Sequence, residues 1–288
     1  MGKLMTELPI ERTYKDRDDV QITFWEWPVA KPKGVIQLIH GLGEHARRYD
    51  ELAGILNKAG FSVYAEDHRG HGKTGKWQLD QKQIERMGKW GPGGMESTVM
   101  AVAKLTDLIE SENPEKPIIV YGHSLGGIIT QNLPVETLDK FSGMIQSGST
   151  SMRLGKPGIG NFNKIWDKTP NPTGFEWLSR DREVGAEFVA DPLTFLALPM
   201  TQLGIKGSVY LAGKPNFPTE PYPALFIVGE LDPVGGVSSN KQLVGDYQKS
   251  GFEDINLYVY DDGRHEMHNE INKEQVFSDI TDWLAERF

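Results

Sequence analysis

Short apolar runs alternate with amphipathic helical patterns along most of the chain. Within the helical stretches apolar residues recur at i, i+3, i+4 and i+7, as at Leu52, Ile55, Leu56 and Ala59, and similar spacing covers 102–109 and 276–284. The apolar runs, which are typical of strands buried in a parallel sheet, are 35–39, 62–65, 118–121, 143–146, 224–228 and 255–260. Residues 21–27 alternate instead and predict an edge strand. Strands that alternate with helices predict an α/β fold, with a mostly parallel sheet flanked by helices on both faces.

The alternation stops between about 149 and 220. This segment is rich in Gly and Pro and carries scattered large apolar side chains, namely Phe162, Trp166, Phe175, Trp177, Phe188, Phe195, Leu196, Leu198 and Met200. Structureless connections longer than about 15 residues are uncommon in compact domains. We therefore expect a core domain formed by 1–148 and 221–288, with an inserted cap formed by 149–220.

The sequence Gly122-His123-Ser124-Leu125-Gly126 follows the apolar run 118–121 and precedes a helical pattern. It matches the G-x-S-x-G pattern, in which a strained turn between strand and helix exposes a nucleophilic serine. Glycines flank the serine because side chains two residues away on either side would collide. The pattern predicts that Ser124 is a nucleophile and that the Leu125 N–H, at the helix start, stabilises an oxyanion.

A second glycine-rich loop follows the run 35–39 directly, as His40-Gly41-Leu42-Gly43. Hydrolases with this elbow take a second oxyanion donor from the loop after the third strand. The backbone N–H of Leu42 is the candidate donor, although Gly41 and Gly43 are equally compatible with an ordinary turn.

The general base is expected near the C-terminus, because the chain order in this fold is serine, acid and then histidine. His265 follows the run 255–260 across a short turn and can reach the same sheet end as Ser124, whereas His268 is expected to begin the last helix. The other histidines are expected to be loop or structural residues.

The acid is expected after the run 224–228, where Asp232 can orient the histidine and stabilise its charged form. Glu230, two residues earlier, is the alternative candidate for the acid, but it is expected to be a solvent-exposed charge in the loop. Asp261 and Asp262 lie close to the histidine in sequence, but at positions where turn residues belong.

Together these segments resemble monoacylglycerol lipases and related lysophospholipases. The resemblance covers most of the chain, excluding the expected cap, and lies in His40-Gly41-Leu42-Gly43-Glu44-His45, Asp67-His68-Arg69-Gly70-His71-Gly72, the elbow, Gly229-Glu230-Leu231-Asp232 and the region around His265. It implies the α/β-hydrolase fold with an eight-stranded sheet and the triad Ser124, Asp232 and His265. It also implies a single-chain acyl ester as substrate, with no metal and no cofactor.

The composition of the chain limits the partners, the metal and disulfide sites and the location that we expect for the protein. The net charge is −9, which argues against a nucleic-acid partner. Cysteine is absent, so disulfides, thiolate metal sites and a cysteine nucleophile are excluded. The chain shows neither a secretion signal nor an apolar run of membrane-spanning length, and we expect a soluble cytoplasmic protein. No stable protein partner is implied, and the cap is expected to touch lipid surfaces only transiently.

Several functions share this scaffold. Dehalogenases and epoxide hydrolases would need an aspartate at position 124, so the serine excludes both. An aminopeptidase would need acidic cap residues to hold an amine, for which Glu176, Asp181, Glu183 and Glu187 are available. An acyltransferase or perhydrolase, or a ligand-binding homologue without catalysis, stays compatible with the sequence. We expect an esterase that acts on monoacylglycerols, lysophospholipids or similar esters.

Overall fold

The computed structural model describes residues 8–152 and 162–288, and within these residues eight strands form one sheet in the order β1-β2-β4-β3-β5-β6-β7-β8. The strands are β1 (Ile10–Lys15), β2 (Gln21–Trp27), β3 (Gly34–Ile39), β4 (Phe61–Glu66), β5 (Ile118–His123), β6 (Gly143–Ser147), β7 (Ala224–Gly229) and β8 (Ile255–Tyr260). The pairs β1–β2 and β2–β4 are antiparallel, and all other pairs are parallel. The predicted eight-stranded, mostly parallel sheet is confirmed.

Residues 21–27 form a strand, but the prediction that it lies at the sheet edge is wrong. β2 is paired on both sides, and β1 occupies the edge instead. The six residues of β1 are largely solvent-exposed and half of them are charged, so they give no apolar signal. Charged edge strands of this kind limit unwanted pairing with other chains.

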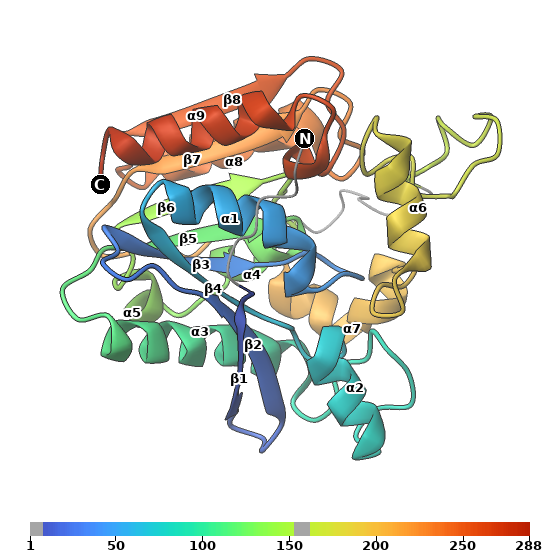
Figure 1. Cartoon of the computed structure of the whole chain (residues 1–288), viewed down its shortest axis with the longest axis horizontal. Coiled ribbons are helices and arrows are strands. Elements are labelled where there is room, and N and C mark those ends of the chain that lie inside the picture. The colour runs from blue at the N-terminus through green and yellow to red at the C-terminus, as the bar shows by residue number, and fades with distance from the viewer. Residues whose placement is uncertain (1–7, 153–161) are drawn as a thin grey trace.

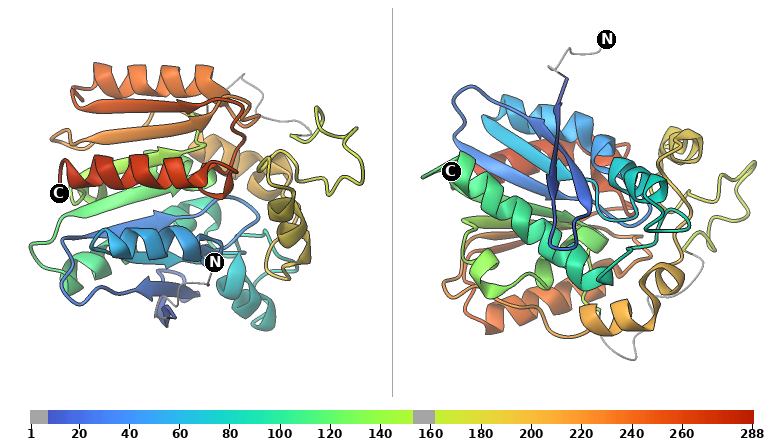
Figure 2. Two further views of the ribbon diagram at one scale, coloured as in Figure 1. Left: turned by 45° about the horizontal axis from the view of Figure 1, so that its top comes forward. Right: turned by 90° about the horizontal axis from the view of Figure 1, so that it is seen from below.

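Helices cover both faces of the sheet (Figure 1). They are α1 (Asp50–Lys58), α2 (Gly72–Asp80), α3 (Gly94–Glu112), α4 (Leu125–Gln131), α5 (Val135–Leu138), α6 (Arg182–Ala190), α7 (Pro199–Leu211), α8 (Gly236–Lys249) and α9 (Lys273–Ala285). Side chains from α1 and α9 pack on one face, and side chains from α3, α4 and α8 pack on the other. The two views of Figure 2 show α1 and α9 before one face and α3 before the opposite face.

Alternation along each parallel strand explains this division. In β3, Val35 joins the core on the α3 side, and its neighbour Ile36 joins the core on the α1 side. Because successive strand residues point to opposite faces, a strand with helices on both faces is apolar along most of its length. The buried Gln37 of β3 donates to the Val102 carbonyl. The core therefore lies in two layers that hold the carboxyl ends of the parallel strands at fixed positions.

The segment between β6 and β7 contains α6 and α7 and, in its described part, no strand. Both helices lie beyond the carboxyl ends of the parallel strands (Figure 1). Leu178, Val184 and Phe188 form a small core of their own, with Phe175 and Trp177 packed against it. Residues 153–161 of the expected cap lie outside the described residues. No helix in the described parts of the chain is long and apolar enough to cross a membrane.

Candidate active site

Ser124 lies at a sharp turn between β5 and α4. Its backbone has φ 51° and ψ −116°, a combination that a residue with a side chain rarely adopts. The strained conformation is held by its neighbours, since the Ser124 N–H donates to the Ser147 carbonyl at 3.0 Å and its own carbonyl accepts the N–H of Gly127 at 3.1 Å. The turn lifts the side chain out of the sheet at the carboxyl end of β5.

The flanking glycines are required by close backbone approach. A Cβ at Gly122 would lie 2.8 Å from the Gly127 Cα, and a Cβ at Gly126 would collide with the carbonyl oxygen of Ile39. The steric reason for the G-x-S-x-G pattern therefore holds at both positions. The second contact also brings the start of α4 against the end of β3, where the loop that carries Leu42 begins.

Asp232 and His265 form a hydrogen-bonded pair. Asp232 follows β7 and His265 follows β8, and because these strands are parallel neighbours their following loops meet at one edge. The distance from His265 Nδ1 to Asp232 Oδ1 is 2.9 Å, and both side chains are buried. Asp232 Oδ1 also accepts the Val234 N–H at 2.8 Å, which fixes the carboxylate. The Glu230 carboxylate instead accepts the Asp262 N–H, as expected of a loop charge.

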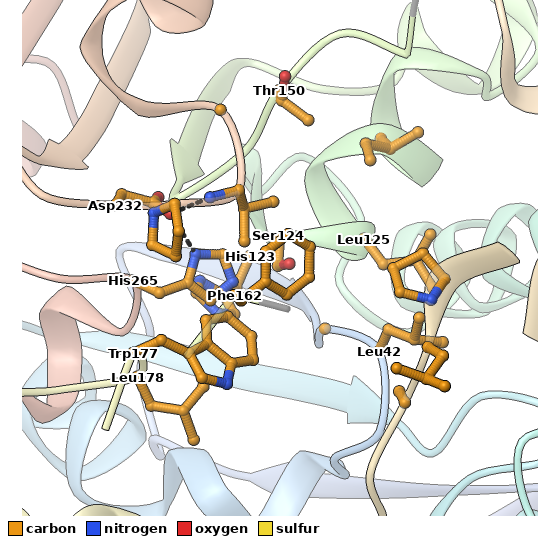
Figure 3. A pocket seen from close by; sticks show the side chains of 18 of the residues that line it. Leu42, His123, Ser124, Leu125, Thr150, Phe162, Trp177, Leu178, Asp232 and His265 are labelled. Atoms are coloured by element: carbon orange, nitrogen blue, oxygen red, sulfur yellow. Dashed lines mark hydrogen bonds and ion pairs between the residues drawn. The ribbon is translucent and has the colours of Figure 1, made fainter. Parts of the chain in front are cut away.

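Ser124 lines the same cavity as this pair (Figure 3). Burial lowers the pKa of His265, but the adjacent Asp232 carboxylate outweighs this effect, so the pKa lies above the ordinary histidine value. His123, which immediately precedes Ser124, packs 4.7 Å from the His265 ring. Burial lowers the pKa of His123 to about 4, so His123 is neutral at physiological pH and His265 is the more basic of the two rings.

Leu42 and Leu125 line the cavity on the side of Ser124 that faces away from His265 (Figure 3). A Cβ built on Gly41 would lie 3.2 Å from the Ser124 Cβ, so the loop that carries Leu42 touches the elbow. The Leu125 N–H is in the first turn of α4, where N–H groups have no helical acceptor. These positions are compatible with the expectation that the backbone N–H groups of Leu42 and Leu125 are the oxyanion donors.

A buried ionic network, which the sequence reasoning missed, joins the loop that carries Leu42 to the loop that carries His265. The Glu44 carboxylate accepts the Gly41 N–H at 2.6 Å and binds Arg48 at 2.7 Å. Arg48 also binds Glu266 through two hydrogen bonds of 2.6 and 2.7 Å. The i, i+4 spacing of Glu44 and Arg48 was an available signal, but nothing in the sequence links either residue to Glu266.

The cavity has a volume of about 610 Å³ and lies between the sheet domain and the segment 149–220. Its apolar lining from that segment includes most of the large side chains singled out in the sequence, namely Phe162, Phe175, Trp177, Phe188, Phe195, Leu196, Leu198 and Met200. Trp166 is the exception, since it packs over the guanidinium of Arg264 at 4.7 Å and not into the cavity. Apolar cavities of this size that converge on a few polar groups are typical small-molecule sites.

His268 is not where the sequence placed it. It lies in a short 3₁₀ turn, Met267–Asn269, ahead of α9, and its ring stacks on Tyr49 at 4.5 Å. Burial holds its pKa well below the ordinary histidine value. Among residues 8–152 and 162–288, no group of three or more His, Asp or Glu side chains is arranged to hold a metal ion.

Comparison with known proteins agrees with this architecture. A family model described as serine aminopeptidase, S33, matches residues 30–272. A monoacylglycerol lipase of Mycolicibacterium smegmatis is 30% identical over 297 aligned positions, which cover 96% of each chain. The monoglyceride lipase of Mus musculus is 28% identical over 277 positions, covering 92% of this chain and 86% of the relative.

Solved structures show the same fold. A thermostable carboxyl esterase from Bacillus coagulans superposes with a TM-score of 0.79 at 24% identity and covers 98% of this chain and 99% of its own. The family model spans most of the chain, and the full-length relatives agree with it. The chain therefore belongs to the serine aminopeptidase S33 family of α/β-hydrolases, is related in sequence to monoacylglycerol lipases, and is a serine hydrolase.

Proposed function

We propose that this esterase hydrolyses single-chain acyl esters, such as monoacylglycerols or lysophospholipids, through an acyl-enzyme intermediate on Ser124. The observation that carries the proposal is the convergence of Ser124 and the hydrogen-bonded Asp232–His265 pair on one apolar cavity of about 610 Å³. The names of the lipase relatives support the substrate class.

In the proposed mechanism, Ser124 Oγ attacks the ester carbonyl carbon while His265 Nε2 takes the hydroxyl proton. The carbonyl electrons move onto oxygen, where the backbone N–H groups of Leu42 and Leu125 stabilise the charge. Collapse of this intermediate expels the alcohol, to which His265 returns the proton. Water then repeats the cycle, releasing the carboxylic acid and restoring Ser124. Asp232 holds the imidazole in the required tautomer and stabilises its charged form.

We propose that the segment 149–220 acts as a cap and that its apolar side chains hold the acyl chain. Leu196, Leu198 and Met200 line the cavity and are also 64%, 51% and 43% exposed, which places them at its rim. Ile205 and Val209 on α7 are exposed as well. An apolar rim suits a substrate that enters from a lipid aggregate, so we propose that the cap touches lipid surfaces transiently.

The aminopeptidase alternative is disfavoured by the positions of the acidic cap residues. The Glu176 carboxylate is occupied by its own loop, where it accepts the Thr173 N–H at 2.5 Å and the Asn163 amide at 2.8 Å. Asp181 caps α6 by accepting the Glu183 N–H. Neither these residues nor Glu187 are among the described residues that line the cavity. A panel of monoacylglycerols, lysophospholipids, short esters and aminoacyl amides tests the choice, and higher activity on the amides would refute the proposal.

The acyl chain length should control activity. Each methylene buried in an apolar pocket contributes about 0.8 kcal/mol, so kcat/KM should rise by up to about fourfold per methylene from acetyl esters until the pocket is filled. The measurement is a series of p-nitrophenyl esters, kept below their micelle concentrations, because a shared leaving group isolates the acyl contribution. Maximal activity on the acetyl ester would mean that the apolar lining does not bind the acyl chain.

Activity should depend on the protonation of His265. The base must be neutral to accept a proton, so kcat/KM should fall as the pH drops through the His265 pKa. Because Asp232 raises that pKa, the inflection should lie above the ordinary value of about 6.5. The pH profile of kcat/KM with an uncharged ester measures it. An inflection near 4 would instead match His123 or a carboxylate.

A further inference from the structure

Trp177 lies against the ring of His265. The two ring centroids are 4.9 Å apart with an angle of 36° between the planes, and Figure 3 shows the indole beside the imidazole. Phe162 packs against the same indole at a centroid distance of 5.0 Å. Trp177 comes from the segment 149–220 and lines the cavity, yet it contacts the residue proposed as the general base.

The backbone holds this contact in place. The His265 N–H donates to the Trp177 carbonyl at 3.3 Å, and the Glu266 N–H donates to the Leu178 carbonyl at 2.7 Å. The Arg264 guanidinium binds two further carbonyls of the same stretch, at 2.5 and 2.9 Å. Three consecutive residues of the histidine loop are therefore bonded to the carbonyls of four consecutive residues, 176–179, and these bonds hold the backbone that carries the indole next to His265.

An aromatic face attracts a cation that lies within about 6 Å of its centroid, and the attraction is larger where water is excluded. The His265 ring satisfies this distance and is buried. The imidazole is neutral before the reaction and positively charged after it takes the serine proton. An interaction that is stronger in the charged form favours the transition state over the ground state.

We propose that Trp177 is a positioning residue that stabilises the protonated form of His265 during catalysis through a cation–π contact. The inference rests on the proposed role of His265 as the general base. It extends the proposed mechanism by assigning one side chain of the insertion a part in the chemistry as well as in lining the cavity.

Other charged or titratable groups also face His265, and they are left intact by changes at Trp177. These groups are Asp232 after β7, His123 at the end of β5, Glu44 in the loop after β3, and Glu266 and His268 after His265 itself. A tryptophan that only excluded water would lower the His265 pKa by desolvation, so its loss would raise that pKa. Loss of a cation–π contact would lower the His265 pKa. The two roles of Trp177 therefore predict pKa changes of opposite sign.

The test is an NMR titration of the His265 imidazole in the whole protein, with its resonance assigned by its loss in His265→Gln. Trp177→Leu should lower the His265 pKa by about half to one unit, the size of a partly desolvated cation–π contact. Trp177→Phe keeps a smaller aromatic face and should give a smaller decrease of the same sign, which tests the inference if the leucine variant does not fold. Trp77→Leu is the control, because Trp77 packs against the small cluster around Ile22 and is not among the residues that line the cavity, and it should leave the titration unchanged.

The kcat/KM profile of each variant should show its acid inflection shifted by the same amount as the NMR titration. An unchanged or raised His265 pKa in Trp177→Leu would overturn the inference, whatever the activity. A lowered pKa that the kinetic inflection does not follow would leave the cation–π contact standing and would refute His265 as the base. Failure of the cation–π inference and failure of the proposed role of His265 as the base therefore give different results.

Discussion

Replacement of Ser124 by alanine is expected to lower kcat by on the order of 10⁶-fold, as removal of the nucleophile does in comparable triads. The loss should be this large because no acyl-enzyme can form, and only the oxyanion donors and substrate binding would act on the remaining reaction. The measurement is steady-state hydrolysis of a medium-chain p-nitrophenyl ester by purified protein.

The matched control is Ser111→Ala, since Ser111 is exposed near the end of α3 and bonds only the Leu108 carbonyl among the described residues. This variant should keep wild-type kcat. Comparable circular dichroism and melting temperature in both variants would show that the loss is chemical and not a failure to fold. Substantial activity in Ser124→Ala would remove the serine from the mechanism.

Asp232→Asn is expected to cost on the order of 10⁴ in kcat while the protein folds normally. The carboxylate accepts a hydrogen bond from His265 Nδ1 at 2.9 Å and so leaves Nε2 free to take the serine proton. The asparagine amide can donate to Nδ1 instead, which places the histidine proton on Nε2 and blocks it as a base. The same ester assay and a thermal unfolding curve measure both parts of this expectation.

Glu230→Gln supplies the comparison, because Glu230 lies two residues away and bonds the backbone of the next loop but not the histidine. It should behave like wild type. If Glu230→Gln is the damaging change and Asp232→Asn is not, the acid of the triad has been assigned to the wrong carboxylate.

The sheet was largely predictable because a parallel strand with helices on both faces is mostly apolar. Six apolar runs became β3 to β8, and the alternating run became β2. β1 was missed because its side chains are mostly exposed, and half are charged, so neither apolar content nor periodicity marks it. That omission also explains why β2 was placed at the edge.

The contact between Asp232 and His265 was predictable from topology, since the loops after neighbouring parallel strands meet at one end of the sheet. Contacts between segments that are distant in the sequence and share no repeating pattern were not predictable. The pairing of Arg48 with Glu266 spans 218 positions, and the pairing of Trp177 with His265 depends on the segment 149–220, whose apolar residues follow no regular period. For the same reason the sequence does not distinguish Trp166, which packs on Arg264, from the apolar residues of the same segment that line the cavity.

The covalent step on Ser124 can be observed directly. A fluorophosphonate probe reacts with activated serine nucleophiles, and peptide mass spectrometry of the labelled protein locates the modified residue. The proposed mechanism predicts stoichiometric labelling of the peptide that contains Ser124, strong suppression of labelling in Asp232→Asn, and none in Ser124→Ala. Labelling at another serine, or rapid ester hydrolysis by a protein that the probe does not modify, would contradict it.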